Sequence, residues 1–248
     1  MTPKKPDITP IVEFDSCRYA PWGDGNGLGL NMSIYPEDVI AVMSDSNEDA
    51  HLLFRAIASL ERPLKGRLLY KGSPLDFSDY RKTLPYKKKI GYVALDAALL
   101  SNRSLGENLL ISRRYFDNKA HAELDRETIE LCRRLEINNK LNLFPGEAYK
   151  EDIRLTLIIR EISKKPEILL VERPSTHLDH ESQLQFIREL KNLTKMALVF
   201  YSFNQELVHD ISLKKARIMK GRVDISPYNR KQDHLDLTPG SAVARGTE

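Results

Sequence analysis

Residues 39–63 combine, at short spacing, the elements of a phosphate-binding site. Residues 39–42 form a β-rich apolar run, and apolar residues recur at helical spacing over 52–60. A working phosphate-binding loop between such a strand and helix reads G-x-x-x-x-G-K-[ST]. Its backbone N–H groups surround the phosphates, its lysine contacts their outer oxygens and its hydroxyl holds Mg²⁺. The segment therefore has the frame of a site for a nucleotide polyphosphate.

The residues that would perform this chemistry are replaced. Counted from the strand end and the helix start, the positions of the two glycines, the lysine and the two hydroxyls hold, in order, Ser44, Asp49, Ala50, His51 and Leu52. None of these side chains brings a positive charge like that of the lysine, and no glycine frees the backbone of the turn.

Three carboxylates stand in the same turn, at Asp45, Glu48 and Asp49. One like-charge contact with a phosphate costs about 4 kcal/mol at about 4 Å and an effective dielectric constant near 20. An acidic loop that simply caps a helix, with Asp49 as the N-cap, explains the same residues. Taken alone, this stretch leaves open both a decayed nucleotide site and an ordinary capping loop.

Composition narrows the class of protein. The 248 residues carry 38 Lys and Arg against 35 Asp and Glu, and the net charge of +3 is too small to indicate nucleic-acid binding. Cys17 and Cys132 lie far apart without CxxC spacing, which favours a reducing compartment and argues against a zinc site. No apolar run approaches the roughly 20 residues of a membrane helix, and the start lacks a signal-peptide core. We expect a cytoplasmic protein without a structural metal.

Strands alternate with helices along the chain. We expect strands at 8–14 (an edge strand), 28–35, 39–42, 65–71, 90–95, 167–172, 196–201, 214–219 and 222–225, and helices within 119–137, 151–164 and 180–194. Residues 80–89 read as a basic exposed connection. The apolar stripe of 119–137 predicts core packing. This order predicts a doubly wound α/β sheet with a helical insertion near residues 101–164.

The chain resembles the nucleotide-binding domain of ABC transporters over about residues 8–227. The segments that carry the resemblance are LLFRAIASLERPLKGRLLYKG, KKIGYVALDAALLSNRSLGENLL, PEILLVERPSTHLD and ARIMKGRV. It implies a P-loop NTPase-like (RecA-like) ABC ATPase fold with an N-terminal antiparallel β subdomain and a helical insertion. We expect one domain over residues 1–227 and a mobile C-terminal tail over 228–248.

The resemblance also assigns site positions, most of which hold other residue types here. Tyr19 stands at the adenine-stacking aromatic, Leu95 at the glutamine near Mg²⁺ and water, Glu172 at the Walker B aspartate, Arg173 at the catalytic glutamate and Ser202 at the switch histidine. The signature segment reads Ala148, Tyr149, Lys150, Glu151 and Asp152, whereas Leu178 and Asp179 keep the D-loop pattern.

Phosphoryl transfer depends on positioning and charge stabilisation, and the lysine, hydroxyl, general base and switch group are all replaced. The pattern predicts a pseudo-ATPase with no catalytic residue intact and no cofactor, and ATP with Mg²⁺ would bind only in an alternative reading. In that reading Glu172 still ligates a cation. Arg173 would need a partner, for which Asp179 and Glu172 are the candidates.

Within the ABC class, the run ALDAALLSNRSLGENLLISRRYF resembles the corresponding segment of Mla/Mce-type ATPases, which move lipid between bacterial membranes. In that family the segment lines the groove for the coupling helix of a permease. The candidate permease-interface residues are Leu99, Leu100, Arg113, Arg114, Tyr115 and Phe116. Packing of the helical insertion is the alternative role for the same residues.

Together these features predict a catalytically degenerate ABC-type subunit that acts as a structural or regulatory component of a membrane transport complex, with lipid as one candidate substrate. Its expected partners are an ABC permease and either an intact ABC ATPase subunit or a second copy, with no nucleic acid, at the cytoplasmic face of the inner membrane. Two alternatives stay open. One is a divergent subunit that binds ATP or supports hydrolysis beside an intact partner, and the other is an ABC-derived interaction protein without a transporter.

Overall fold

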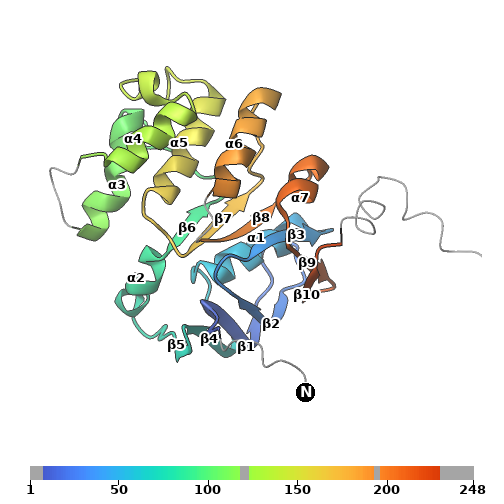
Figure 1. Cartoon of the computed structure of the whole chain (residues 1–248). Helices are drawn as coiled ribbons and strands as arrows, with labels where there is room; N and C mark the ends of the chain where they lie inside the picture. Colours follow the sequence, from blue (N-terminus) through green and yellow to red (C-terminus); the bar gives the residue numbers. More distant parts are fainter. Residues whose placement is uncertain (1–7, 118–122, 193–195, 230–248) are drawn as a thin grey trace, which may run out of the picture.

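One ten-stranded sheet runs through the described part of the chain, in the order β5-β4-β1-β2-β10-β9-β3-β8-β7-β6 (Figure 1). The structure is a computed structural model that describes residues 8–117, 123–192 and 196–229. The tail expected over 228–248 therefore lies, from residue 230 onward, outside the described residues. No helix of the described residues is both long enough and apolar enough to span a bilayer.

The N-terminal half of the sheet is antiparallel. It consists of β1 (Val12–Tyr19), β2 (Leu28–Ile34), β4 (Lys65–Tyr70) and β5 (Ser73–Pro74). The expectation of an edge strand at 8–14 is wrong, because β1 starts later and pairs with β2 on one side and β4 on the other. Pro10 precedes the strand, so its missing N–H is not needed in the ladder.

The other half of the sheet, which includes β3 from between β2 and β4 in the sequence, is mostly parallel. Its strands are β3 (Val39–Ser44), β6 (Ile90–Val93), β7 (Ile168–Glu172), β8 (Ala197–Tyr201) and β9 (Lys214–Met219). The hairpin strand β10 (Arg222–Pro227) runs back against β9 and meets β2 through the pair Arg222 and Gly29. Every residue of β7 and β8 is buried, as expected for parallel strands that are covered on both faces.

Helices cover both faces of the parallel strands (Figure 1). They are α1 (Asn47–Ile57), α2 (Tyr80–Lys88), α3 (Leu105–Asp117), α4 (Arg126–Arg134), α5 (Lys150–Ile162), α6 (His180–Asn192) and α7 (Gln205–Ile211), with a 3₁₀ turn at Asn138–Lys140. Successive side chains of β7 point to opposite faces of the sheet and so belong to two different cores. Ile168 and Leu170 belong to the core that contains α1, whereas Leu169 and Val171 belong to the core that contains α6 and α7. A third core forms between α3, α4 and α5.

The helix expected over 119–137 is shorter in the structure, where α4 runs from Arg126 to Arg134. Asp125 caps α4 by accepting hydrogen bonds from the Thr128 N–H (2.9 Å) and the Thr128 hydroxyl (2.6 Å), so α4 starts only at Arg126. Residues 118–122 lie outside the described residues. The predicted core stripe is confirmed, because Thr128, Leu131 and Cys132 of α4 are buried.

Residues 80–89 are a helix and not the exposed connection expected from their charges. Asp79 caps α2 by accepting a hydrogen bond from the Arg81 N–H (2.9 Å), and Thr83 and Tyr86 face inward. The sequence did not predict this helix, because only two of its positions are buried and two apolar-facing positions do not establish a helical period. Five basic residues and Pro85 also favoured an exposed connection. The Tyr86 phenol is fully buried, donates to the Ile57 carbonyl at the end of α1, and has its pKa raised by that burial.

We predict that Tyr86→Phe destabilises the protein by about 1–3 kcal/mol, because the buried Ile57 carbonyl loses its donor. For a chain of this size the melting temperature should fall by about 2–12 °C, measured by circular dichroism. Tyr80→Phe removes the same hydroxyl from a side chain that is 63% exposed and should change little. Equal losses in the two variants would show that the bond from Tyr86 contributes nothing.

Candidate functional site

The carboxyl ends of β3, β6, β7 and β8 surround a cavity of about 220 Å³. Its lining residues are Trp22, Asn47, Glu48, His51, Leu95, Asp96, Glu172, Arg173 and Tyr201. In open α/β sheets this edge is where ligands bind. Five residues that the sequence singled out are brought together here, namely Glu48, His51, Leu95, Glu172 and Arg173.

The turn after β3 is already the first turn of a helix. Ser46 is the N-cap of α1 and its hydroxyl accepts a hydrogen bond from the Asp49 N–H (3.1 Å), while the Ser44 hydroxyl donates to the Ser46 carbonyl (2.8 Å). The prediction of Asp49 as the N-cap is therefore wrong by one turn. Because the helix begins at Asn47, the turn leaves no open glycine-type loop to wrap around a phosphate.

Asp49 turns away from the cavity. Its carboxylate is 2% exposed and accepts hydrogen bonds from the backbone N–H (2.8 Å) and side-chain amide (3.1 Å) of Asn26. This contact ties the start of α1 to the loop between β1 and β2. Of the three acids expected to face a polyanion, only Asp45 and Glu48 are exposed. Ala50 is fully buried, so the lysine position points into the core.

Glu172 and His51 contact each other directly. The His51 Nδ1 lies 2.8 Å from Glu172 Oε1, and the Tyr92 hydroxyl donates to the same oxygen over 2.5 Å. Burial first, and then the adjacent Glu172 carboxylate, raises the pKa of the Tyr92 phenol. The two positions that the resemblance assigns to Mg²⁺ ligation are thus satisfied by one another.

These residues do not fit Mg²⁺, which prefers oxygen ligands in octahedral geometry. His51 offers a nitrogen, and Glu172 Oε1 already accepts two hydrogen bonds. Within the described ranges, no group of three or more His, Cys, Asp or Glu side chains is arranged to hold a metal ion.

Arg173 is held by an amide and a ring. Its guanidinium donates to Asn47 Oδ1 (3.0 Å) and lies 4.8 Å from the Phe203 ring centroid. The Tyr201 hydroxyl donates to the same amide oxygen (2.9 Å), and burial is the main cause that raises its pKa, against the effect of Arg173. The predicted partners Asp179 and Glu172 are therefore wrong. Asp179 instead accepts the Ser182 N–H (2.8 Å) at the start of α6.

Arg154 of α5 was missed by sequence reasoning. It is 4% exposed and donates to the carbonyls of Ala94 (3.1 Å), Arg173 (3.2 Å) and Glu172. Burial lowers the pKa of its guanidinium to about 10, against the effect of the nearby Glu172. One basic residue inside the apolar run IRLTLII was the available signal. Arg154 joins the helical segment to the carboxyl ends of β6 and β7.

The predicted adenine-stacking ring is not at the cavity. Tyr19 is 4% exposed, packs edge-on against Phe14, and its pKa is raised by burial. Trp22, three residues later, lines the cavity instead, with its ring 5.7 Å from that of His51 and 4.1 Å from the Arg55 guanidinium carbon. The turn-rich sequence between β1 and β2 gave no means of choosing between the two rings.

The remaining assigned positions have local structural roles. The Ser202 hydroxyl accepts the Asn204 N–H (3.0 Å), and Leu178 packs between two cores. Tyr149 is the N-cap of α5, and Asp152 accepts the Tyr149 N–H (3.2 Å) and pairs with Lys140 (2.5 Å). The signature segment Ala148 to Asp152 therefore builds a helix start, and Leu52 is simply core.

The candidate permease-interface residues divide into two groups. Leu100 and Tyr115 are 52% and 65% exposed. Leu99 packs against the core of α6 and α7, and Arg114 is half-buried with its Nε unpartnered. Arg113 pairs with Asp125 and donates to the Glu123 carbonyl (3.1 Å), so it joins α3 to α4. The side chain of Phe116 lies outside the described residues.

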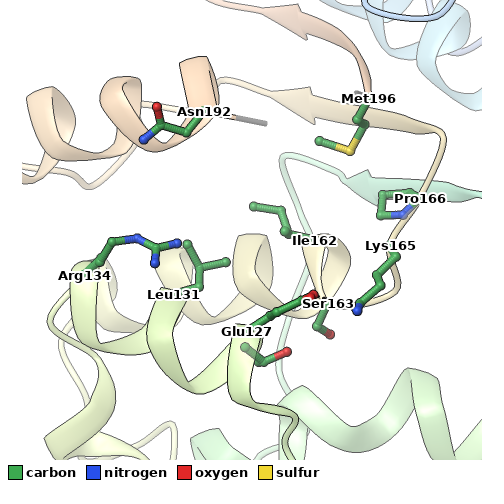
Figure 2. Close-up of a pocket in the computed structure, with 10 residues that line it drawn as sticks. Glu127, Leu131, Arg134, Ile162, Ser163, Lys165, Pro166, Asn192 and Met196 are labelled. Atoms are coloured by element: carbon green, nitrogen blue, oxygen red, sulfur yellow. Dashed lines mark ion pairs between the residues drawn. The ribbon is translucent and has the colours of Figure 1, made fainter. Parts of the chain in front are cut away.

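A second cavity, of about 560 Å³, lies at the edge of the sheet where β7 and β8 begin. It is enclosed by α4, the end of α5 and the residues before β8 (Figure 2). Leu131, Ile162 and Met196 contribute apolar surface. Its charged residues are paired, Lys165 with Glu127 (2.6 Å) and Arg134 with Glu189 (2.9 Å). None of the positions that the resemblance assigns to nucleotide chemistry lines it.

Comparison with known proteins finds relatives among ABC transporter ATP-binding proteins. No family model matches the chain. The methionine import ATP-binding protein MetN of Francisella tularensis subsp. holarctica (strain OSU18) is 24% identical over 197 residues, covering 78% of this chain and 56% of MetN. The L-cystine import ATP-binding protein TcyC of Bacillus subtilis (strain 168) is 25% identical over 191 residues, covering 73% of this chain and 77% of TcyC. The chain is a homologue of ABC transporter ATP-binding proteins. It spans only about half the length of MetN.

Solved structures confirm the ABC ATPase fold. An ATP-bound bacterial Atm1-family ABC exporter superposes with a TM-score of 0.73 at 17% identity, covering 94% of this chain and 41% of the exporter. A dimeric ATP-binding cassette bound to ADP and Pi in a post-hydrolysis state superposes with a TM-score of 0.74 at 16% identity, covering 88% of this chain and 99% of the cassette. The P-loop NTPase-like fold expected for this ABC homologue is therefore correct.

We predict that Asp49→Gly, which restores one glycine of the family loop, destabilises this ABC homologue by about 2 kcal/mol. The variant loses two hydrogen bonds to a charged group and places glycine in a helix. Urea unfolding measures the change. Asp45→Gly, at the exposed acid of the same turn, is the control and should cost less than half as much. A stability equal to wild type in Asp49→Gly would mean that the Asn26 contact does not hold the turn.

Proposed function

We propose that this ABC homologue does not hydrolyse ATP and acts as a structural or regulatory subunit of a membrane transport complex at the cytoplasmic face. The observation that carries the proposal is the direct contact between His51 and Glu172. Those two positions would have to separate to admit a cation, and His51 would have to leave the carboxylate of a residue that is 4% exposed. ATP and Mg²⁺ are accordingly not part of the proposed activity.

Other features support the loss of phosphate chemistry. Arg173 at the catalytic-glutamate position cannot act as a general base, and Ser202 at the switch position is bound to its own loop. Ala50 has no room for a lysine that reaches outward, because it is fully buried. Each replacement removes a separate contribution to phosphoryl transfer.

One alternative has an observation in its favour. Glu172 keeps a carboxylate at the end of β7, and the cavity beside it is open. A subunit that binds nucleotide weakly, or that supports hydrolysis in a dimer with an intact partner, would use this carboxylate. The experiment below separates this alternative from the proposal.

The proposal includes a transported substrate but does not specify which one. Residues 94–116 resemble Mla/Mce-type ATPases and favour a lipid, whereas the names of MetN and TcyC concern import of methionine and L-cystine. A permease is the partner in either case. The exposed Leu100 and Tyr115 supply apolar surface for it.

We predict that Mg-ATP at about 5 mM leaves the melting temperature unchanged and that no phosphate release exceeds that of a heat-inactivated sample. A site filled at 100 times its dissociation constant would stabilise the protein by about 2.7 kcal/mol, or about 5–11 °C. A shift of that size would contradict the proposal and favour the alternative.

The variant Ala50→Lys tests whether the lysine alone is missing. We expect no gain in ATP affinity and a lower stability, because the new ammonium would be placed in the core. Tight ATP binding by this single variant would show that the helical turn after β3 can still open into a phosphate-binding loop.

We predict that Leu100→Ser combined with Tyr115→Ser leaves the fold intact but lowers recovery with native membranes by about tenfold or more, since truncation of an interface anchor costs about 2 kcal/mol. Leu64→Ser combined with Tyr80→Ser removes equally exposed side chains elsewhere, at 70% and 63% exposure, and should have no effect. Undiminished recovery of the first variant would place the partner surface elsewhere, and mass spectrometry of the wild-type eluate would identify the permease.

A further inference from the structure

The opening of the cavity at the carboxyl ends of the strands has an unusual surface. We define the mouth surface as Trp22, Asp45, Glu48, Leu95, Asp96 and Phe203. Glu48, Trp22, Leu95 and Asp96 line the cavity, Phe203 packs on Tyr201 at its wall (5.2 Å between ring centroids), and Asp45 lies in the turn that ends β3. The mouth surface thus combines apolar groups with carboxylates.

The apolar part is exposed. Trp22 is 39%, Leu95 is 43% and Phe203 is 65% exposed. These three side chains come from the β1–β2 loop and from the loops after β6 and β8, so the fold and not the local sequence brings them together. Exposed aromatic and aliphatic groups around a concave site are typical of a surface that another molecule covers.

The charged part is acidic. Asp45, Glu48 and Asp96 are exposed, and across the described residues none of the three has an ion-pair partner. Glu48 and Asp96 line the cavity, and Asp45 lies in the turn after β3, two residues before the lining residue Asn47, so all three stand around the same opening.

The cations near the opening are already engaged. Arg173 is held by Asn47 and Phe203, and Arg55 pairs with Glu61 (2.6 Å) while it stacks on Trp22. His51 is bound to Glu172. Arg173 keeps its positive charge, since an amide and a ring do not neutralise it, but the three carboxylates without ion-pair partners outnumber it. The opening as a whole therefore attracts cations and repels phosphate.

We propose that the mouth surface docks a segment of a partner protein that carries arginine or lysine beside an apolar side chain. The acids pair with the cationic groups, and the apolar side chain covers Trp22, Leu95 and Phe203. This inference rests on the proposed function, because a bound nucleotide would compete for the same cavity. The face that binds an anionic nucleotide in a working ATPase would here bind a cationic segment of a protein.

Trp22 provides a direct readout, since it is the one tryptophan of the chain. The probe is an acetylated and amidated peptide of alternating arginine and leucine without aromatic residues. We expect it to change the Trp22 emission saturably, and a matched peptide with glutamate in place of arginine to have no effect. Raising the salt from about 50 to 500 mM should weaken binding, because exposed charges are screened.

The variant Glu48→Gln with Asp96→Asn removes two charges from the mouth surface. With about 0.2–1 kcal/mol for each exposed pair, binding of the arginine peptide should weaken about 2- to 30-fold. Glu123→Gln with Asp224→Asn removes two exposed charges far from the opening and should leave binding unchanged. Circular dichroism checks both folds, and the salt dependence of the wild type remains decisive if a variant unfolds.

Several outcomes overturn the inference. These are no saturable change in emission, equal binding of the glutamate peptide, equal affinity in the neutralised variant, or binding of spermidine as tight as that of the peptide, which would indicate a site for small cations. The proposed function fails separately. A melting-temperature rise with Mg-ATP contradicts it, whereas inert Mg-ATP together with an inert arginine peptide contradicts only the docking inference.

Discussion

Glu172 places a carboxylate at the buried end of β7, and a carboxylate that is 4% exposed must be supplied with hydrogen-bond donors. His51 and Tyr92 supply them from α1 and β6, while Arg154 covers the adjoining backbone carbonyls from α5. Glu172 thus joins the first helix and β6 through its carboxylate, and the helical segment through its backbone carbonyl. The arrangement of the surrounding cavity depends on the hydrogen bonds that this carboxylate accepts from His51 and Tyr92.

The contact between Glu172 and His51 is one of several that occupy the groups at this edge of the sheet. In a phosphate-binding site the cation and the phosphates would contact the groups at this edge. Here protein side chains hydrogen-bond to them instead, with Asn26 on Asp49, His51 on Glu172 and Asn47 on Arg173. Each contact joins segments that are far apart in the chain, so these side chains tie the edge of the sheet together.

Two surfaces are then available for partners. The mouth surface is acidic and apolar, and the side chains of Leu100 and Tyr115 are exposed near the helical segment. The core beneath both is continuous with the sheet, since α3 packs with α4 and α5 while β7 contributes to the cores on its two faces. A partner bound at either surface would therefore contact segments that are connected to these cores.

The sequence alone determined the parallel strands and the frame of strand, turn and helix at residues 39–63. It also predicted, from the resemblance, that the lysine, hydroxyl and general-base positions are replaced. These features follow from local apolar periodicity and from residue identity, which need no knowledge of distant contacts. The helix α2 was missed because two buried positions give no measurable period, and the edge position of the first strand was wrong because strand neighbours are a property of the sheet. Only the tertiary structure decided that Asp49 faces Asn26, that Glu172 meets His51, that Arg173 rests on Asn47 and Phe203, and that Trp22 replaces Tyr19 at the cavity. These paired residues lie more than 20 residues apart in the chain, and side-chain pairing over such separations is set by the topology that brings the strand ends together.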